Sequence, residues 1–488
     1  MSGFRWTVGE VRTALEDEML RAWISRGAAD PKGDESVEFA GVSTDTRKVV
    51  PGSLFVALSG ERFDGHEFLR EAAEKGATGA VVARRPADAP EGLRLFEVED
   101  TLRALGRLAR HRRRLHRGQV VGIGGSNGKT TTKDLVRAAL AARFRVHATE
   151  GNLNNQVGVP LTLLAAPDEA EVLVVEMGTN EPGEIAILAR IAEPDFAVVT
   201  SIGEEHLEGL GSLEGVLEEE LDMVKGLRLG GIALVAEDPP ALPQRSRAEL
   251  GGYRVRVVGL SEGADLHPDG GEGGIEIQPD GTTRWSWEGV PVHLPLPGRH
   301  NVRNALFALG LAREMGISRE SAARALGRVP RPKLRNEWHT VGSLQVLADC
   351  YNSNPPSLAA AVDLLAGLPA GGAKVAVIGT MREMGDHAPA LHRRAAEQIA
   401  GRVGQGIDLV VATGEFADAF APHAAALGER LVAVVDPVEA YAAASSRLGG
   451  GETILLKASR GESLERWLPL LERDFGENDR GQVTGDRG

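Results

Sequence analysis

The sequence predicts an α/β protein built from three domains. Short, wholly apolar runs alternate with segments of good helix formers over most of the chain, which is typical of parallel sheets covered by helices on both faces. The 488 residues are too many for one hydrophobic core, and no window approaches the roughly 20 apolar residues of a membrane span. We place the domains at residues 1–98, 99–315 and 316–476, followed by a tail, 477–488, whose composition predicts disorder.

The composition favours a soluble protein of a reducing compartment. Cys350 is the only cysteine, so an internal disulfide is excluded and a cytoplasmic location is expected. The formal net charge of −14 argues against nucleic acid as a partner. One basic run, from Arg103 to Arg117, interrupts the acidic chain. It could be a nucleic-acid arm, but its shortness and its lack of aromatic residues favour a solvated helix that ends in a linker.

The first expected domain reads as a small α/β unit. It has a strand at 53–58, a helix at 67–76 and a second strand at 80–83. Before them, the segment 43–47 gathers hydroxyl, carboxyl and guanidinium groups. These groups could receive a phosphate or a uracil edge, although a polar turn accounts for them equally well.

The other two expected domains contain apolar strands separated by helices. In the second domain the strands are expected at 120–123, 172–175, 197–200 and 232–235, and the Gly-, Asp- and Trp-rich residues 261–298 predict an inserted hairpin. In the third domain they are expected at 344–347, 375–378, 409–412, 431–435 and 453–456. The third pattern is that of a doubly wound, Rossmann-like sheet without the glycine-rich dinucleotide fingerprint, so we do not expect NAD.

A glycine-rich stretch joins the first strand of the second domain to a helix expected at 131–144. It reads Gly124-Gly125-Ser126-Asn127-Gly128-Lys129-Thr130-Thr131. A strand, a glycine turn and a helix start form the context of a phosphate-binding loop, in which backbone N–H groups and the helix N-terminus face an anion. The glycine that the full pattern expects five residues before Gly128 is Ile123, so the loop is a short form. We predict that Lys129 reaches a terminal phosphate, that Thr130 holds Mg²⁺, and that the chain binds a nucleoside triphosphate.

Polar residues follow two neighbouring strands of the same expected sheet. Glu176 ends the strand at 172–175 and His206 lies beyond the strand at 197–200, and ligands of such sheets bind at the carboxyl ends of the strands. Glu176 suits Mg²⁺, which prefers oxygen ligands, but an exposed salt-bridge partner is an even alternative. His206 is an unusual ligand of this ion and is more often structural. Asn152, Asn154 and Asn155 form a loop dense in amide groups.

The order of these and further segments resembles the Mur ligases, from about residue 41 to 465. Within that family the chain is similar to the branch that adds a dipeptide. The diamino-acid-adding branch is disfavoured because its Asp-Asn-Pro-Arg motif is absent, and the short phosphate-binding loop is the family's own form. The segments that carry the resemblance are 43–47, Asp64-Gly65-His66, 125–131, 151–155, 158–162, 176–180, His300-Asn301 with Asn304, 349–355 and 457–460.

The resemblance implies a fold, a reaction and a set of roles. The first domain would hold the UDP group of the substrate, and the second would bind MgATP. Residues of the third domain would close over the nucleotide. The reaction would be ATP-driven amide formation between D-alanyl-D-alanine and UDP-N-acetylmuramoyl-tripeptide, through an acyl phosphate and in a monomer. By this resemblance the substrates would contact Ser43, Thr44, Asp45, Arg47, Asp64, His66, Asn152, Asn154, Asn155, Tyr351, Asn352 and Asn354. ATP would contact Gly125, Ser126, Asn127, Gly128, Lys129, Thr130, Thr131, Asn301, Asn304, Arg335, Asp349 and Lys457. Lys129, Glu176, His206 and Glu220 would be catalytic, with Thr130, Glu176, His206 and Glu220 at the metal.

The sequence departs from the family pattern at three positions. The family usually has a lysine carbamylated by CO₂ fourteen residues after the equivalent of His206, and this position is Glu220. We hypothesise that Glu220 supplies the anion for a second metal without CO₂; the alternative is one more solvated acid in the run 218–220, and Lys225 could substitute only if the register slipped. Thr380 stands where the family commonly has Asp, and Ala458 replaces a common glycine.

Other functions share part of this pattern. A kinase with a phosphate-binding loop would use Lys129, Thr130 and Glu176, but it would not need the first domain or Arg335 and Lys457 from the third. A nucleotide-gated binding protein would bind ATP without turnover. A related amide ligase with another amine acceptor is the nearest alternative.

Overall fold

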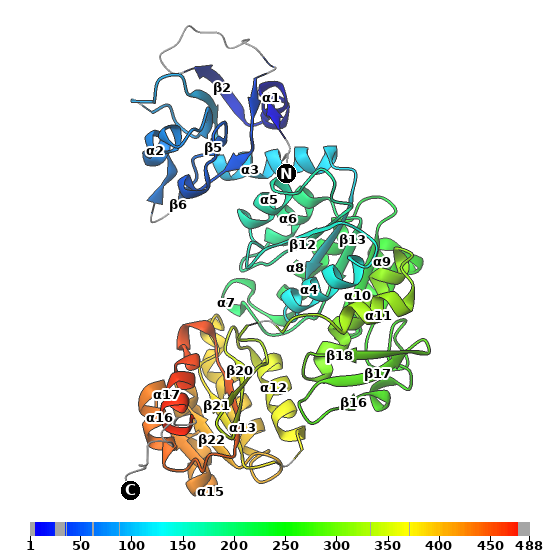
Figure 1. Cartoon of the computed structure of the whole chain (residues 1–488), viewed down its shortest axis with the longest axis vertical. Helices are drawn as coiled ribbons and strands as arrows, with labels where there is room; N and C mark the ends of the chain where they lie inside the picture. Colours follow the sequence, from blue (N-terminus) through cyan, green and yellow to red (C-terminus); the bar gives the residue numbers. More distant parts are fainter. Residues whose placement is uncertain are drawn as a thin grey trace, which may run out of the picture.

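The computed structural model describes residues 5–24, 35, 37–60, 63–86, 88–331, 333–369 and 371–476. These residues form three α/β domains that follow one another along the long axis of the molecule (Figure 1). The predicted fold class is therefore confirmed. The tail for which we predict disorder, 477–488, lies outside the described residues. No helix in the described part of the chain combines the length and the apolar character needed to cross a membrane.

The first domain is a five-stranded sheet in the order β2-β9-β8-β5-β4 with two short strand pairs beside it. β5 and β8 are buried along their whole length and confirm the strands expected at 53–58 and 80–83. The edge strands β2 and β4 carry no continuous apolar run and were not predicted. The elements are β1 (Trp6–Thr7), α1 (Val8–Leu15), β2 (Met19–Ile24), β3 (Glu38–Phe39), β4 (Val42–Ser43), β5 (Leu54–Val56), β6 (Ser59–Gly60), β7 (Phe63–Asp64), α2 (Leu69–Glu74), β8 (Gly79–Val82) and β9 (Arg94–Val98).

The basic run forms helix α3 (Thr101–Leu115), which packs against α1 of the first domain and against α5 and α6 of the second. The expectation that its charges are solvated is wrong for two arginines, because Arg112 and Arg113 are buried. Arg113 donates from Nε to the Ala192 carbonyl at 2.9 Å and from Nη2 to Asp195 at 2.8 Å. The guanidinium thus caps the carbonyl end of α6, where a cation is favoured. Composition could not reveal partners that lie about 80 residues away.

The second domain contains a six-stranded parallel sheet in the order β11-β12-β10-β13-β14-β15. All four predicted strands are present, and the edge strands β11 and β15 are additional. The elements of this sheet and its helices are β10 (Gln119–Gly124), α4 (Lys129–Leu140), β11 (Val146–Ala148), α5 (Gly158–Leu164), β12 (Val172–Glu176), α6 (Glu184–Ala192), β13 (Phe196–Val199), α7 (Leu207–Leu210), α8 (Leu213–Lys225), β14 (Ile232–Ala236), α9 (Ala241–Leu250), β15 (Val255–Val258), α10 (Arg299–Glu314) and α11 (Arg319–Leu326).

The position of β10 brings the ends of three strands together. Its neighbours are β12 and β13, and the chain leaves β10 toward α4 at this reversal of strand order, where ligands of α/β sheets bind. Ile123 pairs with Glu176, and Gly124 pairs with Val199. The glycine loop, Glu176 and the segment that begins at Thr200 therefore meet at one edge of the sheet.

The inserted hairpin is confirmed and extends the core of the second domain. It is an antiparallel sheet of β16 (Glu276–Ile277), β17 (Thr283–Trp287) and β18 (Val290–Leu294). Helix α11 packs on β18 and α4, and the buried core continues to Val329. We therefore propose that the second domain ends near residue 330 rather than at 315.

The third domain has a six-stranded sheet in the order β19-β20-β24-β21-β22-β23, parallel except for the edge strand β19. The five predicted strands are all present. Apolar side chains form a separate core on each face of this sheet, as the doubly wound prediction requires. The elements are β19 (Glu337–Val341), β20 (Leu344–Asp349), α12 (Pro355–Gly367), β21 (Lys374–Ile378), α13 (Ala388–Ala400), β22 (Leu409–Ala412), α14 (Glu415–Ala419), α15 (Ala424–Leu427), β23 (Leu431–Ala433), α16 (Pro437–Ser445), β24 (Thr453–Lys457) and α17 (Trp467–Phe475).

The buried position of Arg113 predicts a loss of stability when it is removed. Replacing Arg113 by Ala should lower the free energy of unfolding by about 3 kcal/mol, because Asp195 and the last carbonyls of α6 lose a charged donor. Urea denaturation measures this loss. Arg117→Ala, at an exposed position two residues after α3, is the matched control and should change the midpoint little; equal midpoints for both variants would contradict the assignment.

Candidate active site

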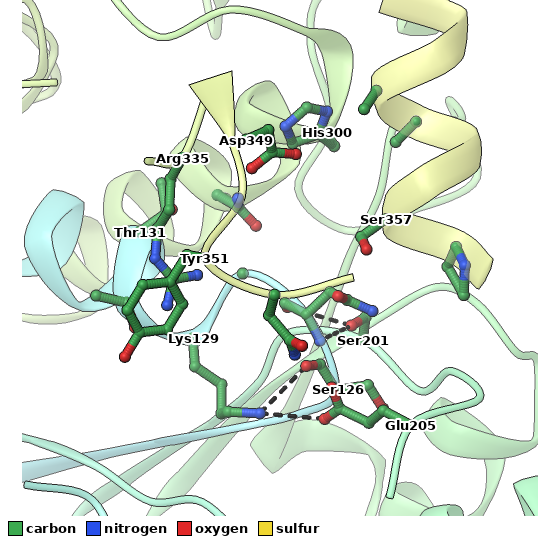
Figure 2. A pocket seen from close by; sticks show the side chains of 18 of the residues that line it. Ser126, Lys129, Thr131, Ser201, Glu205, His300, Arg335, Asp349, Tyr351 and Ser357 are labelled. Carbon is green, nitrogen blue, oxygen red and sulfur yellow. Dashed lines mark hydrogen bonds and ion pairs between the residues drawn. The ribbon is translucent and has the colours of Figure 1, made fainter. Parts of the chain in front are cut away.

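A cavity of about 760 Å³ lies between the second and third domains. It opens at the carboxyl ends of β10 and β12 on one side and of β20 and β24 on the other. Figure 2 shows side chains from both domains around it. The predicted residues that line it are Ser126, Asn127, Gly128, Lys129, Thr130, Thr131, Asn152, Asn154, Glu176, His206, Asn301, Asn304, Arg335, Asp349, Tyr351, Asn352 and Lys457.

The glycine loop forms one wall of the cavity and needs glycine for steric reasons. Gly125 has φ +108, and a Cβ there would lie 2.4 Å from Thr200 Oγ1. Two side chains of the segment after β13 bind the backbone of the loop. Ser201 Oγ accepts from Asn127 N–H at 2.8 Å, and Thr200 Oγ1 donates to the Asn127 carbonyl at 2.7 Å. Helix α4 begins directly after Gly128 without a side-chain cap, which leaves its positive end available to a phosphate.

Glu220 lies beneath this loop. Its side chain is 1% exposed, and its Oε2 accepts the Gly125 N–H at 2.7 Å. Burial raises the pKa of Glu220 to about 7, although the charge of Lys129 acts in the opposite direction. The alternative of a solvated acid is therefore wrong for Glu220. It is also wrong for Glu219, which accepts the N–H groups of Gly183 and Ile185 at the start of α6.

The Lys129 ammonium is folded back into the loop. It donates to the carbonyls of Gly125 at 2.6 Å and Ser126 at 3.1 Å, and it lies 3.2 Å from Glu205 Oε1 (Figure 2). Burial acts to lower the pKa of Lys129, but the nearby carboxylates outweigh it, so the pKa lies above its ordinary value. Lys129 is thus a fully charged cation at the base of the cavity.

Glu176 and Thr130 meet where a magnesium ion is predicted. Glu176 is 2% exposed, and its Oε1 accepts from Thr130 Oγ1 at 3.2 Å and from Asn154 Nδ2 at 2.9 Å. Its Oε2 has no hydrogen-bond partner, and Lys133 Nζ is 3.9 Å away. An unpartnered carboxylate oxygen beside a threonine hydroxyl fits Mg²⁺, which keeps several waters and needs few protein ligands. The described residues contain no cluster of three or more His, Cys, Asp or Glu suited to a metal, so the structure does not bring Glu176, His206 and Glu220 together as one ligand set, and that set stays a prediction.

His206 faces the third domain. Its Nδ1 lies 2.9 Å from Glu383 Oε2, and both residues have a left-handed backbone, with φ of +51 and +65. Burial acts to lower the pKa of His206, but the contact with Glu383 and the charge of Glu205 raise it above its ordinary value. Its ring nitrogens face Glu383 and, 3.9 Å from Nε2, Glu205, and the role of His206 as a metal ligand stays a prediction.

The third-domain wall carries the other predicted nucleotide contacts. Asp349 and Lys457 are paired neighbours on β20 and β24, and Lys457 Nζ is 3.0 Å from Asp349 Oδ2 and donates to the Asn352 carbonyl at 2.6 Å. The Arg335 guanidinium lies over the Tyr351 ring at 4.1 Å. These charged and aromatic groups face the glycine loop across the cavity.

The predicted pair of asparagines on α10 lies beside the glycine loop. Asn301 donates to the Pro297 carbonyl at 2.7 Å, and Asn304 donates to Asn301 at 3.0 Å. A Cβ on Gly128 would lie 2.6 Å from Asn304 Oδ1. Burial lowers the pKa of the adjacent His300 to about 4, so its ring is neutral.

Several predicted residues lie outside this cavity. Gly125 and Glu220 support the loop from below, and Asn354 begins α12. Asn155 accepts the Val157 and Gly158 N–H groups before α5. The residues predicted to bind UDP, namely Ser43, Thr44, Asp45, Arg47, Asp64 and His66, lie in the first domain.

The first-domain residues form two internally bonded turns. Arg47 holds the pKa of Asp45 at about 2 through a side-chain hydrogen bond. His66 Nδ1 lies 2.6 Å from Asp64 Oδ1, and His66 Nε2 accepts the Ala83 N–H at 2.9 Å. His66 is thus committed to positioning β7 against β8, and its role in binding substrate stays a prediction.

Sequence comparison places this geometry in a family. Three models of the Mur ligase family match the chain. The catalytic domain matches residues 38–113, the middle domain 123–312 and the glutamate ligase domain 334–460. The UDP-N-acetylmuramoyl-tripeptide--D-alanyl-D-alanine ligase of Bacillus subtilis (strain 168) is 36% identical over 442 residues, which cover 90% of this chain and 94% of the relative. The chain belongs to the Mur ligase family.

Further relatives of this Mur ligase support the assignment. The ligase of the same name from Escherichia coli (strain K12) is 35% identical, with 89% of this chain and 94% of the relative covered. A crystal structure of MurF from Acinetobacter baumannii matches 97% of this chain and 100% of that chain with a TM-score of 0.84 at 28% identity. The MurF ligase of Thermotoga maritima in complex with ADP matches 89% and 97% with a TM-score of 0.77 at 28% identity.

Sequence reasoning missed several residues of this Mur ligase that contact the predicted ones, and four charged or polar side chains at the cavity stand out. Glu205 and Glu383 pair with Lys129 and His206, Lys133 lies near Glu176, and Asn336 donates to His300 at 3.2 Å. Glu205 precedes His206 directly, but nothing in the sequence separates it from the acidic Glu204.

Of the two other departures from the family pattern, Thr380 accepts the Glu415 N–H at the start of α14, and Ala458 is buried beside Gly379.

The place of Glu220 predicts a charge-dependent effect on turnover. Glu220→Gln keeps an oxygen for the Gly125 N–H but removes the charge that interacts with Lys129, so we expect at least a tenfold loss of turnover, on the order of 1 kcal/mol or more, with little change in Tm. Glu218→Gln, on the exposed part of the same helix, should retain activity. Activity should be the same in CO₂-depleted and bicarbonate-supplemented buffer, and a loss that bicarbonate restores would contradict a CO₂-independent role for Glu220.

Proposed function

We propose that this Mur ligase joins D-alanyl-D-alanine to the terminal carboxylate of UDP-N-acetylmuramoyl-tripeptide, with cleavage of ATP to ADP and phosphate, in the synthesis of peptidoglycan precursors. Curated relatives that span most of the chain at 35–36% identity carry the name of this ligase, and a structural relative binds ADP. The observation that carries the proposal is that Lys129 of the glycine loop shares one cavity with Asp349, Tyr351 and Lys457 of a second domain.

The first chemical step brings two anions together. A carboxylate oxygen of the tripeptide attacks the terminal phosphorus of ATP, and ADP leaves with the electrons of the broken bond. Lys129 and the positive end of α4 offset the repulsion between the two anions and align the phosphate for in-line attack. The product is an acyl phosphate whose carbonyl carbon is now open to a nucleophile.

The second step forms the amide. The amine of D-alanyl-D-alanine attacks the carbonyl carbon, and the bond to phosphate breaks. The acceptor enters as an ammonium group and retains one hydrogen as the amide, so one proton goes to the released phosphate and one goes to solvent. Because the acyl phosphate hydrolyses in water, placing the reaction between two domains serves to exclude solvent.

Magnesium fits this site through its oxygen donors. Thr130 and Glu176 would hold the ion, with His206 and Glu220 as the further predicted ligands, and the bound ion would neutralise charge on the phosphates. Asn154 keeps the Glu176 carboxylate oriented by its hydrogen bond to Oε1.

The remaining predicted residues divide between the three substrates. Asn301 and Asn304 are proposed for the adenine, and Arg335, Asp349 and Lys457 for the nucleotide from the third domain. Tyr351, Asn352 and Asn354 are proposed for the dipeptide, and Asn152, Asn155 and the first-domain turns for the UDP-linked peptide. Use of ATP supports the expected cytoplasmic location. The monomeric state and the absence of nucleic-acid partners stay predictions.

A coupled assay of ADP release tests the proposed function. With UDP-N-acetylmuramoyl-tripeptide present, adding D-alanyl-D-alanine should raise ADP release strongly, because the acyl phosphate turns over only when an amine captures it. Lys129→Ala should lower this rate by about 10²-fold or more, whereas Lys225→Ala, which removes an exposed ion pair with Asp222, should not. Release of ADP that is independent of the dipeptide would indicate a kinase or an ATPase instead.

A further inference from the structure

The Lys129 ammonium has no proton left for a phosphate. An ammonium group has three N–H donors, and those of Lys129 face the Gly125 carbonyl, the Ser126 carbonyl and Glu205 Oε1. The first two acceptors are part of the loop that carries Lys129. Glu205 is the partner from outside the loop, and it is the contact that a terminal phosphate would replace.

Glu205 is a buried carboxylate with a second partner from the third domain. Its side chain is 5% exposed, and its Oε2 accepts from Asn354 Nδ2 at 3.2 Å. The same Asn354 nitrogen donates to Asn127 Oδ1 of the glycine loop at 2.9 Å, while Asn354 Oδ1 caps the first turn of α12. Glu205 thus lies at the junction of the glycine loop and the third domain, with both oxygens used.

A phosphate that takes Lys129 leaves Glu205 without a cation. An unpaired carboxylate in a buried site is strongly destabilised, and here a phosphate would lie beside it. His206 Nε2 is 3.9 Å from Glu205 Oε1, but this ring is already paired with Glu383. Asn354 supplies a dipole and no charge. Glu205 would therefore attract a positive group that arrives with the substrates, either the magnesium ion or the amine acceptor.

The incoming acceptor brings such a group to this place. Its amine carries a positive charge near neutral pH, since an α-amino group has a pKa of about 7.7–8.0. To attack, the nitrogen must come within about 3–3.5 Å of the carbonyl carbon, and that carbon is one bridging oxygen away from the phosphorus that Lys129 contacts. Glu205 lines the same cavity as Lys129 and the glycine loop, which is where the phosphate and the acceptor must meet.

We propose that Glu205 binds the ammonium group of the amine acceptor. Lys129 is paired with this carboxylate before the nucleotide arrives. When Lys129 moves to the phosphate, the ammonium group of the acceptor replaces it as the partner of Glu205. Asn354 holds the other carboxylate oxygen, so the binding site for the ammonium is complete only with the third domain in place. This assignment rests on the proposed function and names the residue that selects a cationic acceptor.

Two acceptors of different charge test the assignment. D-alanyl-D-alanine carries an ammonium group, whereas hydroxylamine is largely uncharged at neutral pH and captures an acyl phosphate as a hydroxamate. For Glu205→Gln we expect the KM for the dipeptide to rise about 10- to 100-fold, the range of a lost hydrogen bond to a charged group. The rate of hydroxamate formation should stay within about twofold of wild type. The KM for ATP should stay the same or fall, because the variant has no carboxylate charge that loses its partner when Lys129 moves to the phosphate.

The matched control is Glu204→Gln, which removes the ion pair with Arg394 across the same domain boundary without changing the cavity lining. Its KM for the dipeptide should stay within about twofold of wild type, since an exposed pair contributes little. If Glu205→Gln folds poorly, Glu205→Asp gives the same readout, with a smaller rise in the KM for the dipeptide.

Two results would overturn the assignment: a wild-type KM for the dipeptide in the Glu205 variants, or a loss of hydroxamate formation as large as the loss of dipeptide ligation. A wild-type enzyme that forms hydroxamate but does not use the dipeptide would instead overturn the proposed function, and the acceptor assignment with it.

Discussion

The site depends on how tightly the glycine loop is held between β10 and α4. Its backbone has no room for a side chain at Gly125, and the N–H of that residue is taken by Glu220 from below. Thr200 and Ser201 bind the backbone of Asn127 from the side. The bond from Gly125 to Glu220 is buried and the bonds to Asn127 are partly buried, so their loss would leave polar groups poorly compensated by solvent. The loop therefore keeps one shape, and the Lys129 side chain is the part that can move.

Two sheets contribute the same kind of edge to the cavity. β10 and β12 end at it in the second domain, and β20 and β24 end at it in the third. In a parallel sheet the carboxyl ends are where side chains and helix starts converge, so the domain boundary joins two such edges. The Asn354 amide, at the first turn of α12, is the direct hydrogen-bonded link from the third domain to Asn127 and Glu205. Its position makes the cavity sensitive to how the third domain is placed.

The sequence predicts the strands that are buried on both faces, because their apolar runs are continuous. It does not predict β11 or β15, which lie at sheet edges and mix polar with apolar residues. Glu176 is recognisable because it ends a predicted strand beside the glycine loop. Glu220 is recognised from the family pattern, but its contact with Gly125 spans 95 residues. Arg113 is the clearest failure, because local composition marks it as solvated and only the packing of distant segments buries it. Glu205 is an omission, because nothing in the sequence singles it out.

The charge of the cavity differs from that of the chain. The whole sequence carries −14, yet six Lys or Arg and five Asp or Glu side chains line the cavity. Such a balance gives no strong positive field to attract phosphate from a distance. Binding therefore relies on the positive end of α4 together with an exchange, in which Lys129 leaves a carboxylate of the protein for a phosphate. Each exchange frees a carboxylate inside the cavity, and a freed carboxylate attracts Mg²⁺ or an ammonium group. A site of this kind therefore couples the arrival of an anion to the arrival of a cation, which is the order that ligation of a carboxylate to an amine requires.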